Sequence, residues 1–291
     1  MSSFLQHQAQ HLAAAMPPLL VETLRVAQTV RMGVHGRRRV GGGYSFWQYR
    51  SYEGHDPATL IDWKQSARGD NLYVRQREWE AVQTVYLWAD RSGSMHYQSK
   101  KDFPLKTERA HVLMMALAHL LLRGGETAVW LTQPTIAARS LPSFNTMAAR
   151  LLPITKTDDN LPPFMPLARH AHIVLCSDFL GDINLWRERL RAYTSLNMRG
   201  VLLHVTDPEE ENPSFHGRVR VSGLENETPL LLSEAEAVRP IYHERFEAHK
   251  ARLQDLAKSV GWSYMHHVTS FPSTAILMNL INTLTAPQWS K

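Results

Sequence analysis

Three oxygen-bearing side chains alternate in the stretch ADRSGSM: Asp90, Ser92 and Ser94. They directly follow residues 82–89, an apolar segment typical of a buried β-strand. One carboxylate and two hydroxyls in a single loop suit Mg²⁺ or Mn²⁺, which take about six oxygens at about 2.1 Å, and they suit zinc poorly. Asp and Ser are also common caps at strand-to-helix turns. The pattern therefore predicts either a divalent-cation site or a polar turn.

A further acidic residue, Asp178, follows another apolar segment, residues 171–177. In open α/β sheets, ligands bind beyond the carboxyl ends of the strands, near the point where the strand order reverses. If the two apolar segments are neighbouring strands, Asp178 and Asp90 converge on one crevice. We therefore expect Asp178 to contribute to the same site.

The other metal-binding residue types are expected to be structural. Cys176 is the only cysteine, which excludes an intrachain disulfide and a thiolate cluster built from one chain, and it lies inside an apolar segment. The histidine pairs lack an acidic or cysteine partner at a metal-binding spacing, so we expect strand positions without a ligand role. These pairs are His170 with His172 and His266 with His267.

The elements that would position this chemistry alternate between strand-like and helix-like from about residue 80 onward. Val, Ile and Leu occupy both faces of the strands, which is typical of a mainly parallel sheet covered by helices on both sides. The sequence therefore predicts a doubly wound α/β fold. Strands are expected at 82–89, 127–132, 171–177, 200–206 and 262–268. Helices are expected at 105–125, 143–151, 183–197 and 274–284, and a further helical region follows Ser233 and runs to about residue 258. Pro240 is expected to divide the helical region that ends near residue 258.

Residues 1–80 have a different pattern and are expected to form an extension, followed by the α/β domain at 81–288. A helix is predicted at 8–32, and three glycines at 41–43 interrupt the pattern. Aromatic residues then alternate with polar ones, which indicates a small β-rich module. Trp63 could anchor a partner, but we favour a buried tryptophan that joins the extension to the main domain.

The net charge of +5 is concentrated in the first fifty residues, which carry six arginines and one glutamate. This segment could favour an acidic protein face, an anionic lipid surface or nucleic acid, and a solvated basic turn is an equally good interpretation. No nucleic-acid motif accompanies it, so no nucleic-acid partner is expected, whereas peripheral membrane contact stays open. The chain has no apolar run of about 18 residues and no basic secretory leader, so we expect a cytoplasmic protein without a transmembrane segment.

Two stretches resemble known families. ADRSGSM followed by LKTERAHVLMMALAHLL resembles the first strand, metal-ion-dependent adhesion site (MIDAS) loop and first helix of a von Willebrand factor A domain, which has a Rossmann-like sheet. Upstream, YRSYEGHDPATLIDWKQSARGD resembles the signature of the bacterial domain of unknown function 58, which precedes an A-type domain. IDWKQSAR is its most specific part, and the resemblance covers roughly residues 37–285. The signature has Gly and Arg where this chain has His55 and Thr59.

The resemblance implies a metal site for Mg²⁺ or Mn²⁺ in the ADRSGSM loop, with Asp178 acting through a water molecule. Family members generally supply a threonine from a glycine-rich loop as well. Here that region reads TKTDDNLPPFMP, without glycines and with three prolines. Thr157 is the best candidate for this ligand, and Thr155 is the alternative.

The resemblance also implies binding rather than catalysis, because the cation keeps a coordination position that an Asp or Glu of a protein partner completes. The family is associated with MoxR-type AAA+ ATPases in chaperone-like maturation of other proteins. This chain has no G-x-x-x-x-G-K-[ST] motif, so the ATPase would be a separate partner.

The alternative is a Mg²⁺-dependent hydrolase or phosphotransferase that uses Asp90 as nucleophile or metal ligand. A haloacid-dehalogenase-like enzyme would have a second aspartate where Ser92 stands, which counts against this alternative. The chain also lacks the G-x-S-x-G motif of serine hydrolases.

Overall fold

The computed structural model describes residues 45–54, 56, 59, 61–69, 71–78, 83–132, 134–152, 154–157, 160–221 and 230–285. These residues form two compact units, a small one within 45–78 and a larger α/β domain from residue 83 onward. The predicted helix at 8–32, the glycines at 41–43 and most of the basic segment lie outside the described residues.

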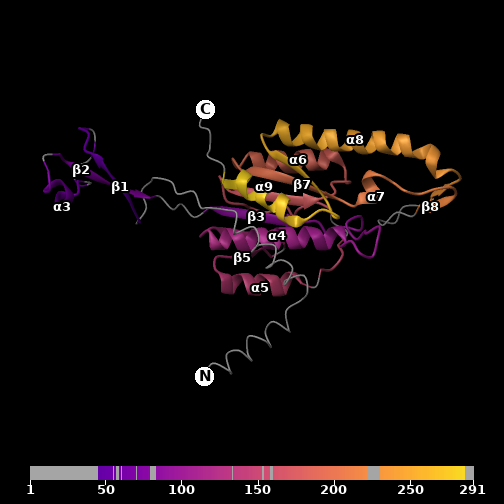
Figure 1. Cartoon of the computed structure of the whole chain (residues 1–291), viewed down its shortest axis with the longest axis horizontal. Coiled ribbons are helices and arrows are strands. Elements are labelled where there is room, and N and C mark those ends of the chain that lie inside the picture. The colour runs from indigo at the N-terminus through magenta and orange to yellow at the C-terminus, as the bar shows by residue number, and fades with distance from the viewer. Residues whose placement is uncertain are drawn as a thin grey trace, which may run out of the picture. The chain divides into compact units, whose positions relative to one another are not determined.

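A six-stranded sheet forms the centre of the α/β domain, in the order β10-β7-β6-β3-β4-β5 (Figure 1). The strands are β3 (Thr84–Ala89), β4 (Thr127–Trp130), β5 (Ile136–Ala138), β6 (His172–Ser177), β7 (Arg199–Thr206) and β10 (Ser263–Val268). All neighbours pair in parallel except β4 and β5. The predicted doubly wound, mainly parallel α/β fold is confirmed. The chain adds β4 on one side of β3 and later β6 on the other, so the strand order reverses between β3 and β6.

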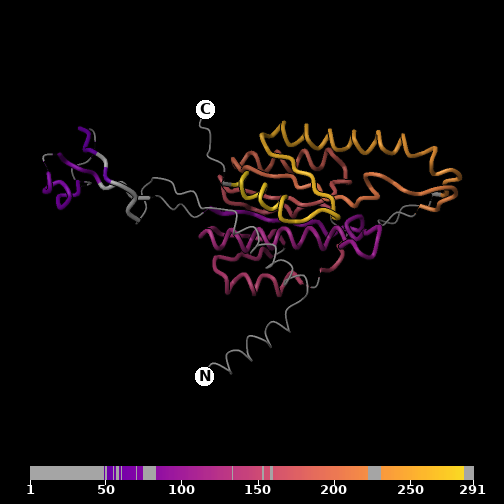
Figure 2. Tube along the Cα trace, in the orientation of Figure 1, coloured from indigo at the N-terminus to yellow at the C-terminus, as the bar shows by residue number. Residues whose placement is uncertain are grey.

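Helices cover both faces of the sheet. On one face lie α4 (Lys106–Arg123), α5 (Leu141–Leu151) and α9 (Ser273–Thr285), and on the other α6 (Ile183–Thr194) and α8 (Ala235–Ser259). A single turn, α7 (Pro208–Glu211), follows β7, and a ribbon of β8 (Val219–Val221) and β9 (Leu230–Leu232) precedes α8. Figure 2 shows that the loop between β3 and α4 reaches the same end of the sheet as α7.

Strand β3 divides its side chains between two apolar cores, one on each face of the sheet. Val85, Leu87 and Ala89 belong to the core under α4, α5 and α9, whereas Tyr86 and Trp88 belong to the core under α6 and α8. Successive side chains of a strand point to opposite faces, so an apolar residue at every position is what burial on both faces requires. The end of β3 is therefore held firmly from both sides.

The end of helix α4 follows from local chemistry, whereas the predicted break in α8 was wrong. Helix α4 ends at Gly124, and Gly125 adopts φ +86°, a left-handed conformation that glycine reaches without steric cost. Pro240 does not divide α8, which continues through it. A proline removes one backbone hydrogen bond near the start of this helix, while Leu253, Leu256 and Ala257 bury its other end in the core.

The small unit is an antiparallel pair of β1 (Ser45–Ser51) and β2 (Tyr73–Glu78) with a single helical turn, α3 (Trp63–Ser66). The side chain of Asp62 caps α3 by accepting the Gln65 N–H at 3.0 Å. The Ser66 hydroxyl accepts the Tyr73 N–H at 2.9 Å and so joins the turn to β2. Trp63 is 64% exposed, so β1, β2 and α3 do not bury it within the small unit, and its predicted role in joining the extension to the main domain stays a prediction.

Among the described helices, none combines the length and the apolar character that crossing a bilayer would require.

Candidate functional site

The two predicted acidic residues lie at the ends of neighbouring strands. Strands β3 and β6 pair in parallel, and the backbone N–H of Asp90 continues this pairing by donating to the Cys176 carbonyl at 2.9 Å. Asp178 follows β6 by one residue. The two apolar segments are therefore neighbouring strands, as the predicted convergence of Asp90 and Asp178 requires, and they lie where the strand order reverses.

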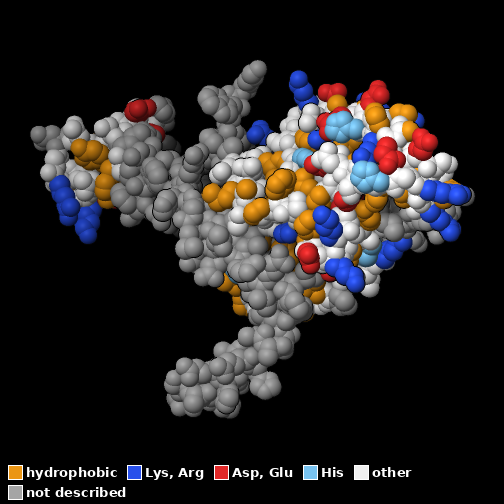
Figure 3. Space-filling view, turned by 45° about the vertical axis from the view of Figure 1, so that its right-hand side comes forward, with side chains coloured by type: hydrophobic (Ala, Val, Ile, Leu, Met, Phe, Trp, Pro, Cys, Tyr) orange, Lys and Arg blue, Asp and Glu red, His pale blue; other side chains and the backbone are white. Residues whose placement is uncertain are grey.

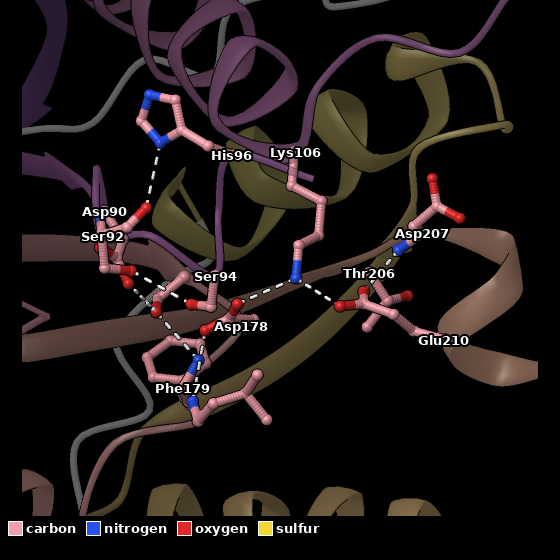
Figure 4. Close-up of polar contacts among 12 residues, drawn as sticks. Asp90, Ser92, Ser94, His96, Lys106, Asp178, Phe179, Thr206, Asp207 and Glu210 are labelled. Carbon is pink, nitrogen blue, oxygen red and sulfur yellow. Dashed lines mark hydrogen bonds and ion pairs between the residues drawn. The ribbon is translucent and has the colours of Figure 1, made fainter. Parts of the chain in front are cut away.

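The loop after β3 gathers the three predicted oxygen donors (Figure 4). The Oδ1 atom of Asp90 accepts the Ser92 N–H at 2.7 Å, which turns the loop back toward the strand. The hydroxyls of Ser92 and Ser94 are 3.2 Å apart. Asp90 and Ser92 are buried, whereas Ser94 is partly exposed, so the open side of the cluster is at Ser94.

The site loop is anchored in the core rather than free in solvent. Met95 is fully buried, and its carbonyl accepts the Thr107 N–H of α4 at 2.8 Å. His96 holds the loop as well, because its Nδ1 atom is 3.0 Å from the Ser92 carbonyl. The hydroxyls are thus positioned by packing and backbone hydrogen bonds.

Ser177 is a supporting residue that the sequence interpretation missed. Its hydroxyl donates to Oδ2 of Asp90 at 2.6 Å and accepts the Phe179 N–H at 2.9 Å. It occupies the last position of β6 and is fully buried. Serine at a strand end is common, so nothing in the local sequence indicates that this one contacts Asp90.

Lys106 is the second residue that the sequence interpretation missed. Its side chain is fully buried, and its ammonium lies 2.9 Å from Asp178 Oδ2 and 2.6 Å from Glu210 Oε1. Figure 4 shows the ammonium between these two carboxylates, with Asp178 between Lys106 and the serine loop. Lys106 begins α4 and Glu210 belongs to α7, so one side chain ties two helices to the end of β6.

The electrostatics of the site are dominated by buried carboxylates. Burial, followed by the charge of Asp178, raises the pKa of Asp90 to about 6, although the hydrogen bonds from Ser177 and Ser92 act in the opposite direction. For Lys106, burial alone would lower the pKa, but Asp178 and Glu210 outweigh it and raise the pKa above its usual value. The ammonium is therefore a permanent charge of the site.

Thr157 lies beside the site loop, since its backbone N–H donates to the Arg91 carbonyl at 2.9 Å. This bond brings Thr157 to the edge of the ADRSGSM loop, where the missing ligand was predicted. Thr155, the alternative, is exposed. The role of either threonine as a ligand stays a prediction.

The donor set fits a small divalent cation. Adjacent ligands of an octahedral Mg²⁺ ion at about 2.1 Å are about 3.0 Å apart, close to the 3.2 Å between the Ser92 and Ser94 hydroxyls. Within the described ranges, no three His, Cys, Asp or Glu side chains form a metal-binding group. A cation here would therefore depend on the serine hydroxyls and water besides Asp90, which suits Mg²⁺ or Mn²⁺.

Three histidines lie between the end of β6, β7, β10 and α8. The ring centroids of His204 and His266 are 5.1 Å apart, and His249 lies 5.7 Å from His204. Their nitrogens have other partners: His266 Nε2 is 3.0 Å from Glu211 Oε1, and His249 Nε2 is 3.3 Å from the Asp178 carbonyl. His266 thus contacts an acidic residue that the local sequence does not show.

The comparisons with known proteins support the family resemblance. The model of the family described as "Protein of unknown function DUF58" matches residues 48–252. No curated protein matches the chain.

Three of the solved structures that match this chain come from bacteria. An aerotolerance-related membrane protein from Bacteroides fragilis is 15% identical with a TM-score of 0.40, and the match covers 69% of this chain and 97% of that one. The conserved hypothetical protein BatB from Bacteroides thetaiotaomicron is 16% identical with a TM-score of 0.40, over 70% of this chain and 100% of that one. An uncharacterized membrane spanning protein from Vibrio fischeri is 15% identical with a TM-score of 0.20, over 69% and 97%.

The family match spans most of the small unit, the site loop, Asp178 and most of α8. It extends over more than half of the chain. This chain belongs to the DUF58 family.

Proposed function

We propose that this protein is a non-catalytic binding module in which the ADRSGSM loop holds Mg²⁺ or Mn²⁺ and a partner's Asp or Glu completes the coordination. The observation that carries the proposal is the pair of hydroxyls 3.2 Å apart beside buried Asp90, at the switch point of the sheet. A cation held there would present an open position on the Ser94 side, where the cluster reaches solvent. Ligation by a carboxylate is directional and charge-assisted, so it would join two proteins specifically.

The surroundings of Asp90 favour binding over the alternative of a hydrolase or phosphotransferase. A nucleophilic carboxylate must reach its substrate, but Asp90 is fully buried, where a small ion fits more readily than a substrate. We therefore assign it a structural and cation-holding role.

A MoxR-type AAA+ ATPase is the partner we propose, in chaperone-like assembly or maturation of other proteins. Support comes from membership of the family and from the absence of a phosphate-binding loop motif in this sequence. Dependence on an ATP-consuming partner would also place the protein in the cytoplasm. The face shown in Figure 3 carries acidic, basic, histidine and apolar side chains side by side. Recognition of the partner would then depend on local contacts more than on long-range electrostatic attraction by a surface of one charge.

Calorimetric titration with Mg²⁺ and Mn²⁺, with and without a MoxR-type ATPase, tests the proposal. Wild-type protein is expected to bind one ion and to bind the ATPase more tightly when the ion is present. Asp90→Ala should abolish both effects. Asp255→Ala provides the matched control, because it removes an aspartate from the exposed surface of α8.

Binding of the ATPase without metal, unchanged in Asp90→Ala, would contradict the metal-bridge mechanism and leave the fold intact. Mg²⁺-dependent phosphatase or esterase turnover that Asp90→Ala abolishes would replace the binding role with the enzymatic alternative.

A further inference from the structure

The most unusual charged group in the described part of the chain is Lys106. Its side chain has no solvent exposure, although lysine is almost never fully buried unless it is paired. It lies one side chain away from the proposed cation site, because Asp178 is both its partner and a predicted metal ligand. A permanent positive charge thus adjoins the place where a second cation would bind.

The carboxylates around the ammonium outnumber it. Asp178 and Glu210 share the one ammonium, and Asp90 repels Asp178 without an ion pair of its own among the described side chains. Three carboxylates and one ammonium leave an excess of negative charge in a buried place. This excess of negative charge would attract a divalent cation. The Lys106 ammonium already offsets part of it and so weakens that attraction.

The ammonium also restricts the geometry of Asp178. Its Oδ2 atom accepts from Lys106 at 2.9 Å, and its Oδ1 atom accepts the Leu180 N–H at 3.3 Å. Both oxygens are therefore engaged before any metal arrives. Removing the ammonium would free Oδ2, whereas the backbone contact to Oδ1 would persist.

We propose that Lys106 is a positioning residue that limits the affinity of the ADRSGSM loop for divalent cations, by neutralising Asp178 and holding its Oδ2 atom away from the ion. This inference rests on the proposed function, since it concerns the same loop. Because Glu210 competes with Asp178 for the ammonium, α7 influences the site through Lys106. A contact that moved α7 would therefore change how strongly the Lys106 ammonium interacts with Asp178.

The test compares two variants that differ only at Lys106: Glu210→Gln and the double variant Lys106→Met/Glu210→Gln. Replacing Lys106 alone would leave buried Asp178 and partly exposed Glu210 without their cation and could unfold the protein, so Glu210 is neutralised in both variants. Titration calorimetry with MnCl₂ alone measures affinity, and circular dichroism confirms folding. We expect the double variant to bind Mn²⁺ about tenfold or more tightly than Glu210→Gln, because a like charge that contacts the predicted ligand Asp178 is removed.

Glu210→Gln alone should bind more weakly than wild type, since Asp178 then receives the whole ammonium. Should the Lys106→Met double variant fail to fold, Lys106→Gln/Glu210→Gln replaces it, because glutamine can still donate to Asp178 without a charge. Equal affinities of the folded double variant and Glu210→Gln, within twofold, would overturn the proposal.

The outcomes also separate this proposal from the proposed function. If wild type binds no Mn²⁺ and the double variant does, the metal-dependent function fails and the role of Lys106 stands. If neither binds Mn²⁺, both fail. If wild type binds Mn²⁺ but the two variants do not differ, only the role of Lys106 fails.

Discussion

At the scale of single residues, the site depends on side chains that support Asp90 rather than on Asp90 alone. Ser177 joins the end of β6 to the carboxylate of Asp90 and to the backbone of Phe179. Two buried polar groups, a carboxylate oxygen and an N–H, use the same hydroxyl. Such a hydroxyl stabilises the fold mainly because its loss leaves both partners unsatisfied.

Ser177→Ala is therefore expected to lower the free energy of unfolding by about 1–3 kcal/mol in urea denaturation. The exposed Ser233→Ala serves as the matched control and should change the free energy of unfolding by less than about 0.5 kcal/mol. In an Asp90→Asn background, the cost of Ser177→Ala should fall, because the buried charge that needs the hydroxyl is gone. An unchanged cost in that background would show that the contact with Asp90 contributes nothing.

Acid should destabilise the protein through His111, a core residue of α4. Burial lowers the pKa of His111 to about 4, although the Thr107 carbonyl, 2.8 Å from Nδ1, favours the protonated ring. The unfolded chain takes up this proton near pH 6.5 and the folded one only near pH 4, so between these values the unfolded state binds more protons. Stability therefore falls as the pH is lowered from about 6.5 to 4, by up to about 3 kcal/mol from this residue.

His111→Gln is expected to remove that part of the pH dependence. The measurement is the free energy of unfolding in urea at pH 7 and at pH 4.5, compared between wild type, His111→Gln and the control His243→Gln on the exposed surface of α8. Equal losses of stability in all three proteins would refute the assignment.

The sequence predicted the site residues unevenly, and distance along the chain explains why. Asp90, Ser92 and Ser94 could be predicted because they share one loop after one strand. Lys106 could not, because a lysine at the start of a helix is ordinarily solvated, and its partners lie 72 and 104 residues away. Short-range pattern carries no information about such a contact.

At the scale of elements, strand β7 requires a glycine. A Cβ atom at Gly200 would overlap the indole ring of Trp262, which precedes the neighbouring strand β10. The indole N–H donates to the Met198 carbonyl at 3.2 Å, so the ring cannot move aside without losing this bond. The close approach of ring and backbone fixes how the end of α8 enters β10.

Gly200→Ala is expected to cost about 1–3 kcal/mol of unfolding free energy through overpacking. Gly69→Ala is the matched control, because nothing lies within 4 Å of its added Cβ atom. Urea denaturation with an unchanged m-value would attribute the loss to the folded state. A midpoint equal to that of wild type would mean that the ring relaxes freely.

The long strands and helices could be predicted because their apolar pattern extends over many residues. The three-residue strands β5, β8 and β9 could not, since three residues are too few for a period to be recognised. The predicted break at Pro240 was wrong for a related reason. Proline disfavours a helix locally, but the buried residues farther along α8 stabilise the continuous helix.

At the scale of the whole molecule, the family signature and the site belong to different units. The signature residues Asp62 and Ser66 make hydrogen bonds inside the small unit, to Gln65 and Tyr73, so their local role is structural. The division into an extension and an α/β domain was predicted from a change of pattern near residue 80. Exposure of Trp63 could not be predicted, because an aromatic residue suits a buried and an exposed turn equally well.

The small unit should be removable without loss of the α/β domain. Ser45 pairs with Glu78, so the two ends of the unit lie side by side and a short Gly-Ser linker can replace residues 45–78. Neither apolar core of the α/β domain contains a residue from this range. We therefore expect the shortened protein to unfold cooperatively within about 2 °C of the full chain, and to retain its affinity for Mn²⁺. Non-cooperative melting would show that the sheet depends on the small unit, whereas retained stability with lost ATPase binding would locate partner recognition in the signature.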